Sequence, residues 1–122
     1  MRPDGYGLLQ LAHREYGFFV EFDRGTVHPS ALRAKFAAYF RYRSTPMAER
    51  DFHGFPITLV ITSGPAGEQR ITEAVRAVSG GAETQFPILV TTTGWLESNP
   101  GALWQRIWFD PIHSRRRVWP VD

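Results

Sequence analysis

Two short, nearly continuous apolar runs in the second half of the chain constrain the fold most. They are Pro56–Thr62 and Phe86–Thr92. Apolar runs of this length that show no polar alternation are typical of strands covered on both faces of a sheet. Between them, Ser63–Gly67 predicts a turn, and Glu68–Val78 carries apolar residues at helical spacing. A strand, a helix and a strand in this order predict a right-handed crossover that joins two parallel strands.

The first half of the chain predicts an antiparallel hairpin followed by a helix. Tyr6–Ala12 is apolar, and Tyr16–Asp23 alternates with many aromatic and β-branched residues, so both are expected to be strands. Pro29–Arg43 has an apolar stripe at helical spacing, with a proline suited to the first turn. Ser44–Phe55 is polar and predicts a loop.

The sequence does not fully determine the secondary structure of the C-terminal third. Thr93–Leu103 predicts a loop or a short helix, and Trp104–Phe109 fits a strand or a helix equally well. The tail, Ser114–Asp122, is basic and then aromatic. The element order is therefore β-β-α-β-α-β with an undecided end, and we expect a mixed α/β sheet flanked by helices.

Composition narrows the function classes. With 122 residues the chain is expected to form one domain, and it contains no cysteine for a disulfide, a zinc-thiolate site or a thiol nucleophile. No apolar stretch approaches the ~18 residues of a membrane span, and no secretory signal is evident, so we expect a cytoplasmic protein. The net charge is +2, and thirteen of the fourteen basic residues are arginine, which suits phosphate contacts but also follows from coding bias. Four histidines lack metal-ligand spacing and are interpreted as structural or surface residues: His13, His28, His53 and His113.

Acidic residues of the predicted hairpin form the main candidate site. Glu21 and Asp23 are two residues apart on one strand, so both carboxylates project from one face. If the hairpin turn is centred near Arg14, Asp4 lies opposite Asp23 or Arg24, with Glu21 on the diagonal. Converging carboxylates without His or Cys suit Mg²⁺ or Mn²⁺, so we expect these three acids to share one or two divalent ions of either kind.

Lys35, the only lysine, can reach the acidic residues of the hairpin. On its helix it lies beside Tyr39 and Tyr42, and its long stem can extend past the apolar stripe toward the acids. Such a lysine can orient a metal-bound water or stabilise developing charge. Plainer interpretations stay open: the strand acids as charges on an edge strand, Asp4 as a turn or cap residue, Lys35 as a surface lysine and Tyr39 as a core residue.

These residues also resemble a known pattern. The order Pro3-Asp4, then Glu21-Phe22-Asp23, then Lys35 to Tyr39 is similar to the PD-(D/E)xK nuclease superfamily, which has a restriction endonuclease-like fold. The segments Pro3–Gly7, Tyr16–Thr26 and Leu32–Tyr39 resemble the replication-relaxation family more closely, and the likeness covers most of residues 3–93. Proteins of that family are associated with plasmid replication and DNA relaxation, and typically place a winged-helix DNA-binding domain before the nuclease-like one.

The resemblance implies a DNA-processing domain with a candidate metal-dependent endonuclease site, in the C-terminal part of a longer protein. The chain departs from the superfamily at one point, because the usual lysine two residues after Glu21 is Asp23 here, and Lys35 would have to replace it. The implied catalytic residues are Asp4, Glu21, Asp23, Lys35 and Tyr39, with the metal on Asp4, Glu21 and Asp23. The expected phosphate-binding residues are Arg24, Arg41, Arg43, Arg115, Arg116 and Arg117. Expected partners are DNA, with replication or mobilisation proteins and a second copy of the chain as further candidates.

Two other functions stay open at this point. The first is a non-catalytic DNA-binding or assembly module on the same fold, in which the acids are structural and the arginine-rich tail binds. The second is a protein-interaction domain, which would require an exposed apolar patch of tryptophans. The tryptophans concerned are Trp95, Trp104, Trp108 and Trp119.

Overall fold

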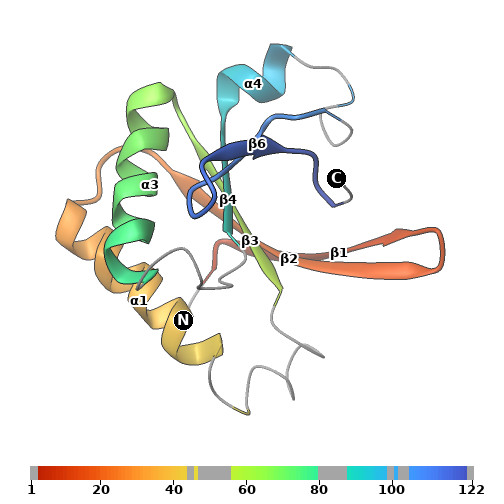
Figure 1. Cartoon of the computed structure of the whole chain (residues 1–122), viewed down its shortest axis with the longest axis horizontal. Helices are drawn as coiled ribbons and strands as arrows, with labels where there is room; N and C mark the ends of the chain where they lie inside the picture. The colour runs from red at the N-terminus through yellow and green to blue at the C-terminus, as the bar shows by residue number, and fades with distance from the viewer. Residues whose placement is uncertain are drawn as a thin grey trace.

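The chain folds around a single mixed sheet, which confirms the α/β class. The computed structural model describes residues 3–43, 46, 56–79, 88–98, 101 and 105–120. The described elements are β1 (Gly5–Leu11), β2 (Arg14–Asp23), α1 (Pro29–Arg43), β3 (Ile57–Thr62), α3 (Pro65–Ser79), β4 (Ile88–Thr92), α4 (Thr93–Ser98), β5 (Trp108–Asp110) and β6 (Arg115–Arg117). The six strands are ordered β1-β2-β3-β4-β5-β6 (Figure 1). β2, β3 and β4 are parallel. β1 is antiparallel to β2 at one edge, and the hairpin of β5 and β6 is antiparallel to β4 at the other.

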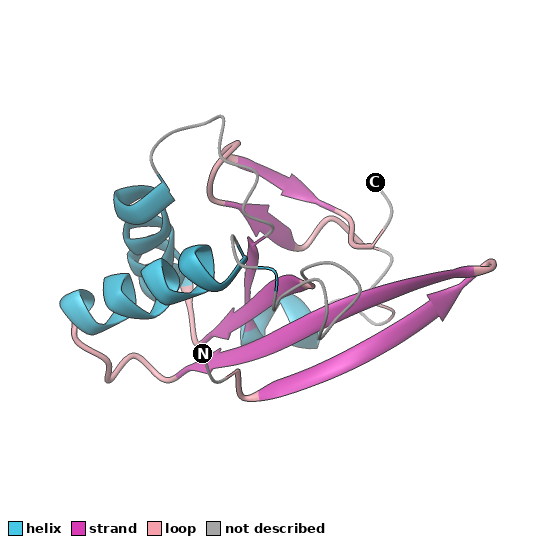
Figure 2. Ribbon diagram, turned by 90° about the horizontal axis from the view of Figure 1, so that it is seen from below, coloured by secondary structure: helices cyan, strands magenta, loops and turns pink. Residues whose placement is uncertain are grey.

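One face of the sheet is covered by α1 and α3. Both helices connect neighbouring parallel strands, so two right-handed crossovers in the same direction bring them to the same side, where they pack together (Figures 1 and 2). The core beneath them combines apolar side chains of both helices with those of β3 and β4. Its buried members are Leu32, Phe36, Tyr39, Val60, Ile71, Ala74, Val75, Ile88 and Val90.

The opposite face has a core of its own, built largely from the C-terminal segment. Its buried members are Leu59, Leu89, Ile107, Trp108 and Trp119. The ring of Phe18 on β2 packs edge-to-face on Trp119, with 5.3 Å between the ring centroids. Because β3 and β4 are covered on both sides, their apolar runs need no polar alternation, as the sequence predicted.

The N-terminal hairpin forms as predicted, but its register differs. The turn consists of Ala12 and His13, which have positive φ values of 48° and 71°, and Leu11 pairs with Arg14. Two adjacent left-handed residues are the geometry of a tight two-residue hairpin, shorter than the predicted turn centred on Arg14. Continuing the observed register by one residue places Asp4 opposite Glu21, two to three residues from the expected position.

Several boundaries in the second half also differ from the prediction. Helix α3 begins at Pro65 and so includes the last three residues of the predicted turn Ser63–Gly67, while α1 has the bounds that the sequence predicted. The undecided segment contributes strand β5, and the basic tail contributes strand β6, which pairs with it. The predicted loop at residues 44–55 falls outside the described residues, except for Pro46. Among the described residues, no helix combines the length and apolarity needed to cross a membrane.

The described tryptophans do not form the exposed apolar patch that the protein-interaction hypothesis requires. Trp108 and Trp119 are buried, with 3% and 6% of their surface exposed. Trp95 is partly exposed, and the guanidinium of Arg116 lies over its ring at 4.7 Å from the centroid. Trp104 lies outside the described residues. Burial of Trp108 and Trp119 takes two of the four rings out of the surface that the protein-interaction hypothesis requires.

Candidate functional site

Glu21 is the centre of the candidate site. The alternation of β2 turns its side chain toward α1, on the same face as Phe19, and only 3% of its surface is exposed. The ammonium of Lys35 forms an ion pair with Oε2 of Glu21, and the hydroxyl of Tyr39 donates a hydrogen bond to Oε1. Lys35 and Tyr39 are one helical turn apart, so α1 presents both donors to one carboxylate. The predicted approach of Lys35 to the acids is confirmed.

Tyr39 is both a core residue and a partner of the site. Its ring stacks on Phe19 with 6.2 Å between centroids, and 1% of its surface is exposed. Burial raises the pKa of its hydroxyl well above the ordinary value, and the hydrogen bond to Glu21 and the negative charges of Glu21 and Asp4 raise it further. Tyr39 therefore stays protonated and acts as a hydrogen-bond donor over the whole physiological pH range.

Asp23 makes a second, separate set of contacts at the end of β2. Its Oδ2 accepts a hydrogen bond of 2.9 Å from the hydroxyl of Thr62 and forms an ion pair with Arg70 on α3. Its Oδ1 accepts a weaker bond of 3.3 Å from the backbone N–H of Gly25, and Arg70 also donates to the carbonyl of Gly25. Gly25 has a φ of 80°, a conformation that favours glycine. Asp23 and Arg70 thereby fix the turn that leads from β2 toward α1.

Asp4 lies beside these acids but is exposed. Its Oδ2 accepts a hydrogen bond of 2.8 Å from the backbone N–H of Phe22, the residue between Glu21 and Asp23. Its charge also contributes to the raised pKa of Tyr39. The structure therefore brings Asp4 to the same end of the hairpin as the two buried acids, through a backbone contact.

The arrangement does not provide a three-acid metal centre. Within residues 3–43, 56–79, 88–98 and 105–120, no group of three or more His, Asp or Glu side chains is placed to hold an ion. Both oxygens of Glu21 and both of Asp23 already contact protein donors. An ion shared by these acids would have to compete with Lys35 and Arg70 for the two carboxylates. The residues as placed do not fit the expected Mg²⁺ or Mn²⁺, and metal binding stays a prediction.

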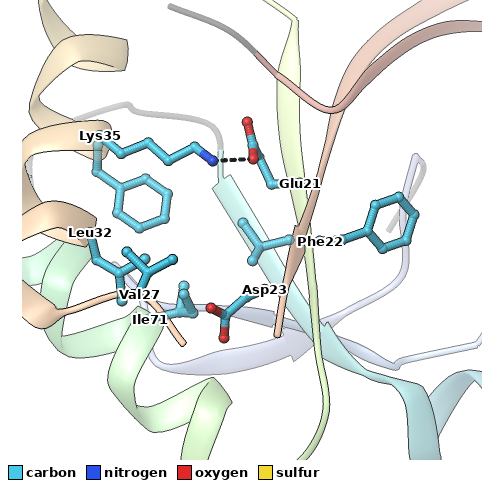
Figure 3. A pocket seen from close by; sticks show the side chains of 9 residues that line it. Glu21, Phe22, Asp23, Val27, Leu32, Lys35 and Ile71 are labelled. Carbon is cyan, nitrogen blue, oxygen red and sulfur yellow. Dashed lines mark hydrogen bonds and ion pairs between the residues drawn. The ribbon is translucent and has the colours of Figure 1, made fainter. Parts of the chain in front are cut away.

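A small pocket opens between β2 and α1 beside these contacts. Figure 3 shows Lys35 extending from α1 across the pocket to Glu21, with Asp23 further along the strand. The rest of the lining is mostly apolar, so the charged groups meet in surroundings that strengthen their attraction. The lining residues are Glu21, Phe22, Asp23, Val27, Leu32, Lys35, Phe36, Val60 and Ile71.

The expected phosphate-binding arginines divide into two groups. Arg24, Arg41 and Arg115 are exposed, and the described part of the chain shows no ion pair for any of them. Arg116 instead contacts groups within the protein: it forms an ion pair with Glu68 and donates a hydrogen bond of 3.0 Å to the carbonyl of Ile107.

Arg117 and Arg43 are both partly buried. Arg117 contacts Oδ2 of Asp110 at 3.4 Å, across the hairpin of β5 and β6. Arg43 is partly buried, and burial lowers the pKa of its guanidinium. The arginine-rich tail is therefore largely a structural strand, and only Arg115 of its three arginines is exposed.

Asp110 is a further charged residue that the sequence did not single out. It is 4% exposed, and its Oδ1 accepts hydrogen bonds of 3.0 Å from the backbone N–H groups of Ile112 and His113. Burial alone would raise its pKa, but these bonds and the ring of His113 hold the pKa below the usual value. The pattern of an aspartate two and three residues before its donors is a turn signal, and it accounts for the tight connection from β5 to β6.

The sequence patterns also gave no sign of three residues that support the site: Gly67, Thr62 and Arg70. A Cβ on Gly67 would lie 2.0 Å from the hydroxyl oxygen of Thr62, so only glycine leaves that hydroxyl its place beside Asp23. Thr62 is the β3 partner of Asp23 in the parallel register. Arg70 lies 47 residues after Asp23, so no local pattern pointed to their contact.

Comparison with known proteins gives one match. Residues 1–58 match the model of the replication-relaxation family, and this segment is slightly less than half of the 122 residues. No curated protein and no solved structure matches the chain. The matched segment contains Asp4, Glu21, Asp23, Lys35 and Tyr39. The contacts of Lys35 and Tyr39 with Glu21 thus lie within the segment that is similar to the replication-relaxation family, whereas Thr62 and Arg70 lie beyond it.

Proposed function

We propose that this chain is a DNA-processing domain of a plasmid or mobile-element replication, relaxation or mobilisation protein, and that it binds DNA through the exposed residues Arg24, Arg41 and Arg115. The observation that supports this most is the convergence of Lys35 and Tyr39 on Glu21 inside the segment similar to the replication-relaxation family. The five residues that the resemblance singled out lie at one end of the N-terminal hairpin and on the helix that follows it. A winged-helix domain elsewhere in the full protein stays part of the proposal.

In the proposed role the two buried acids are structural. Lys35 neutralises Glu21, and Arg70 neutralises Asp23. This pairing removes negative charge that would otherwise repel a phosphate backbone from this end of the sheet. Buried carboxylates held by cations from α1 and α3 also lock both helices to β2, which favours a binding or assembly module.

The binding proposal is tested by the salt dependence of affinity for duplex DNA, measured by fluorescence anisotropy. Replacing Arg24, Arg41 or Arg115 by alanine should each reduce the slope of log affinity against log salt by about one unit for every lost phosphate contact. Arg14→Ala, at the hairpin turn, is the matched control and should leave the slope unchanged. Slopes that stay the same in all three variants would contradict the proposal.

Metal-dependent DNA cleavage is the second candidate function. One observation favours it: Lys35 contacts Glu21, so it can supply the lysine that the superfamily pattern has two residues after the glutamate and that this chain replaces with Asp23. The test is nicking of supercoiled plasmid in Mn²⁺. Cleavage that falls by about two to three orders of magnitude in Lys35→Ala, and is not restored in Lys35→Arg, would support an enzyme. Arg33→Ala, exposed on the same helix, is the control. A wild-type chain that binds plasmid but leaves it supercoiled would exclude this candidate.

A further inference from the structure

A second hollow lies at the carboxyl ends of β2 and β3, next to the Glu21 site. It encloses about 620 Å³, including the part open to solvent. In α/β sheets the crevice outside the carboxyl ends of parallel strands is a common place for a ligand. Aromatic, cationic and hydroxyl side chains all contribute to its lining. The lining residues are Phe22, Asp23, Arg24, Ile61, Thr62, Ser63 and Thr93.

Phe22 is the unusual residue of this hollow. It belongs to β2, which has a strand on each side, yet 59% of its surface is exposed. Figure 3 shows its ring pointing away from the Lys35–Glu21 pair. Its partner in the parallel register, Ile61, is only half-buried beside it. An open aromatic face next to an aliphatic side chain costs free energy in water, and it offers a surface on which a planar base can stack.

The rim of the hollow supplies groups that suit a sugar and a phosphate. Arg24 directly follows β2, is exposed, and makes no ion pair or hydrogen bond with the described residues. The hydroxyl of Thr93 donates to the carbonyl of Ser63 at 3.3 Å, which joins the ends of β3 and β4. Both Ser63 and Thr93 line the hollow. Asp23 adds little repulsion, because Arg70 neutralises it.

We propose that this hollow binds one nucleotide of single-stranded DNA, with the base stacked on Phe22 and the adjacent phosphate held by Arg24. The proposal deepens the proposed function and rests on it. It selects single strands because the bases of a duplex are already stacked on each other and cannot offer a free face to the ring. A protein or peptide partner on the same ring is the competing occupant.

The test compares the binding of a short labelled oligothymidine with that of a duplex, using the whole chain. Phe22→Ala should weaken single-strand binding about tenfold and change duplex binding less than about twofold, since stacking on an aromatic side chain is lost only for the unpaired base. Phe22→Trp should retain binding. The matched control is Leu8→Ala, because Leu8 is also 59% exposed but lies on β1 outside the hollow.

A second measurement on the wild-type chain keeps the proposal testable if Phe22→Ala does not fold. Photo-crosslinking with an iododeoxyuridine oligonucleotide should give an adduct on the peptide that contains Phe22. Unchanged single-strand affinity in Phe22→Ala, equal loss for single and double strands, or an adduct elsewhere would each overturn the nucleotide site while leaving DNA binding in place. A wild-type chain that binds neither form of DNA would overturn the proposed function as well.

Discussion

The ion pair between Lys35 and Glu21 should show a measurable coupling energy. The perturbation is a double-mutant cycle with Lys35→Met, Glu21→Gln and both together. The Glu21 side chain is 4% exposed and that of Lys35 is 41% exposed, so the pair is intermediate between a surface and a buried ion pair. Exposed pairs are worth about 0.2–1 kcal/mol, and removing one partner of a fully buried pair costs about 3–5 kcal/mol.

When Lys35 is removed, Tyr39 still donates one hydrogen bond to Glu21. The free energy of unfolding that is lost should therefore stay well below the cost of removing one partner of a fully buried ion pair. We expect a coupling of about 1–2 kcal/mol at neutral pH, measured by urea unfolding with an unchanged m-value. The exposed hydrogen bond between Gln69 and Glu73 is the control, and its coupling should be about 0.5 kcal/mol or less. A coupling for the first pair no larger than that of the control would refute the argument that this contact locks α1 to β2.

Three further changes test other parts of the site. Gly67→Ala should cost about 1–3 kcal/mol in urea unfolding, because its Cβ would collide with the hydroxyl of Thr62, whereas Gly64→Ala has open space and should be nearly neutral. Tyr39 has a raised folded pKa, so its contribution to stability is complete below about pH 10 and falls as the pH rises through that value; Tyr39→Phe should flatten this alkaline loss in pH-dependent unfolding. Asp110 has a lowered folded pKa, so its contribution is present above about pH 4 and falls as the pH drops below that value; Asp110→Asn should remove this part of the acid loss.

Local patterns predicted the parts of the fold that depend on neighbours in the sequence. The bounds of α1 agree because proline, an apolar stripe and a following loop all mark the same segment. The face shared by Phe19, Glu21 and Asp23 follows from strand alternation alone, and all three are buried together. The position of Lys35 followed from helical phase combined with this strand face, which is why its contact with Glu21 could be predicted.

Features that depend on tertiary contacts or turn geometry could not be predicted. Ala12 and His13 lack the Asn-Gly or Asp-Gly signal of a two-residue turn, so the register of the hairpin was misplaced. Arg70 approaches Asp23 from a helix far along the chain, and this contact neutralises a carboxylate that the strand pattern alone predicts as a metal ligand. The strand Arg115–Arg117 is too short and too charged to show strand periodicity, so the sequence did not predict the internal ion pairs of Arg116 and Arg117.

The affinity of the wild-type chain for plasmid DNA at two salt concentrations tests the central claim most directly. If exposed arginines bind the phosphate backbone while Lys35 and Arg70 neutralise the buried acids, log affinity should fall steeply and linearly with log salt between about 50 mM and about 200 mM. The same affinity should be found for DNA of unrelated sequence, since phosphate contacts carry no sequence information. Absence of binding at the lower salt concentration, or an affinity that does not change with salt, would contradict the account.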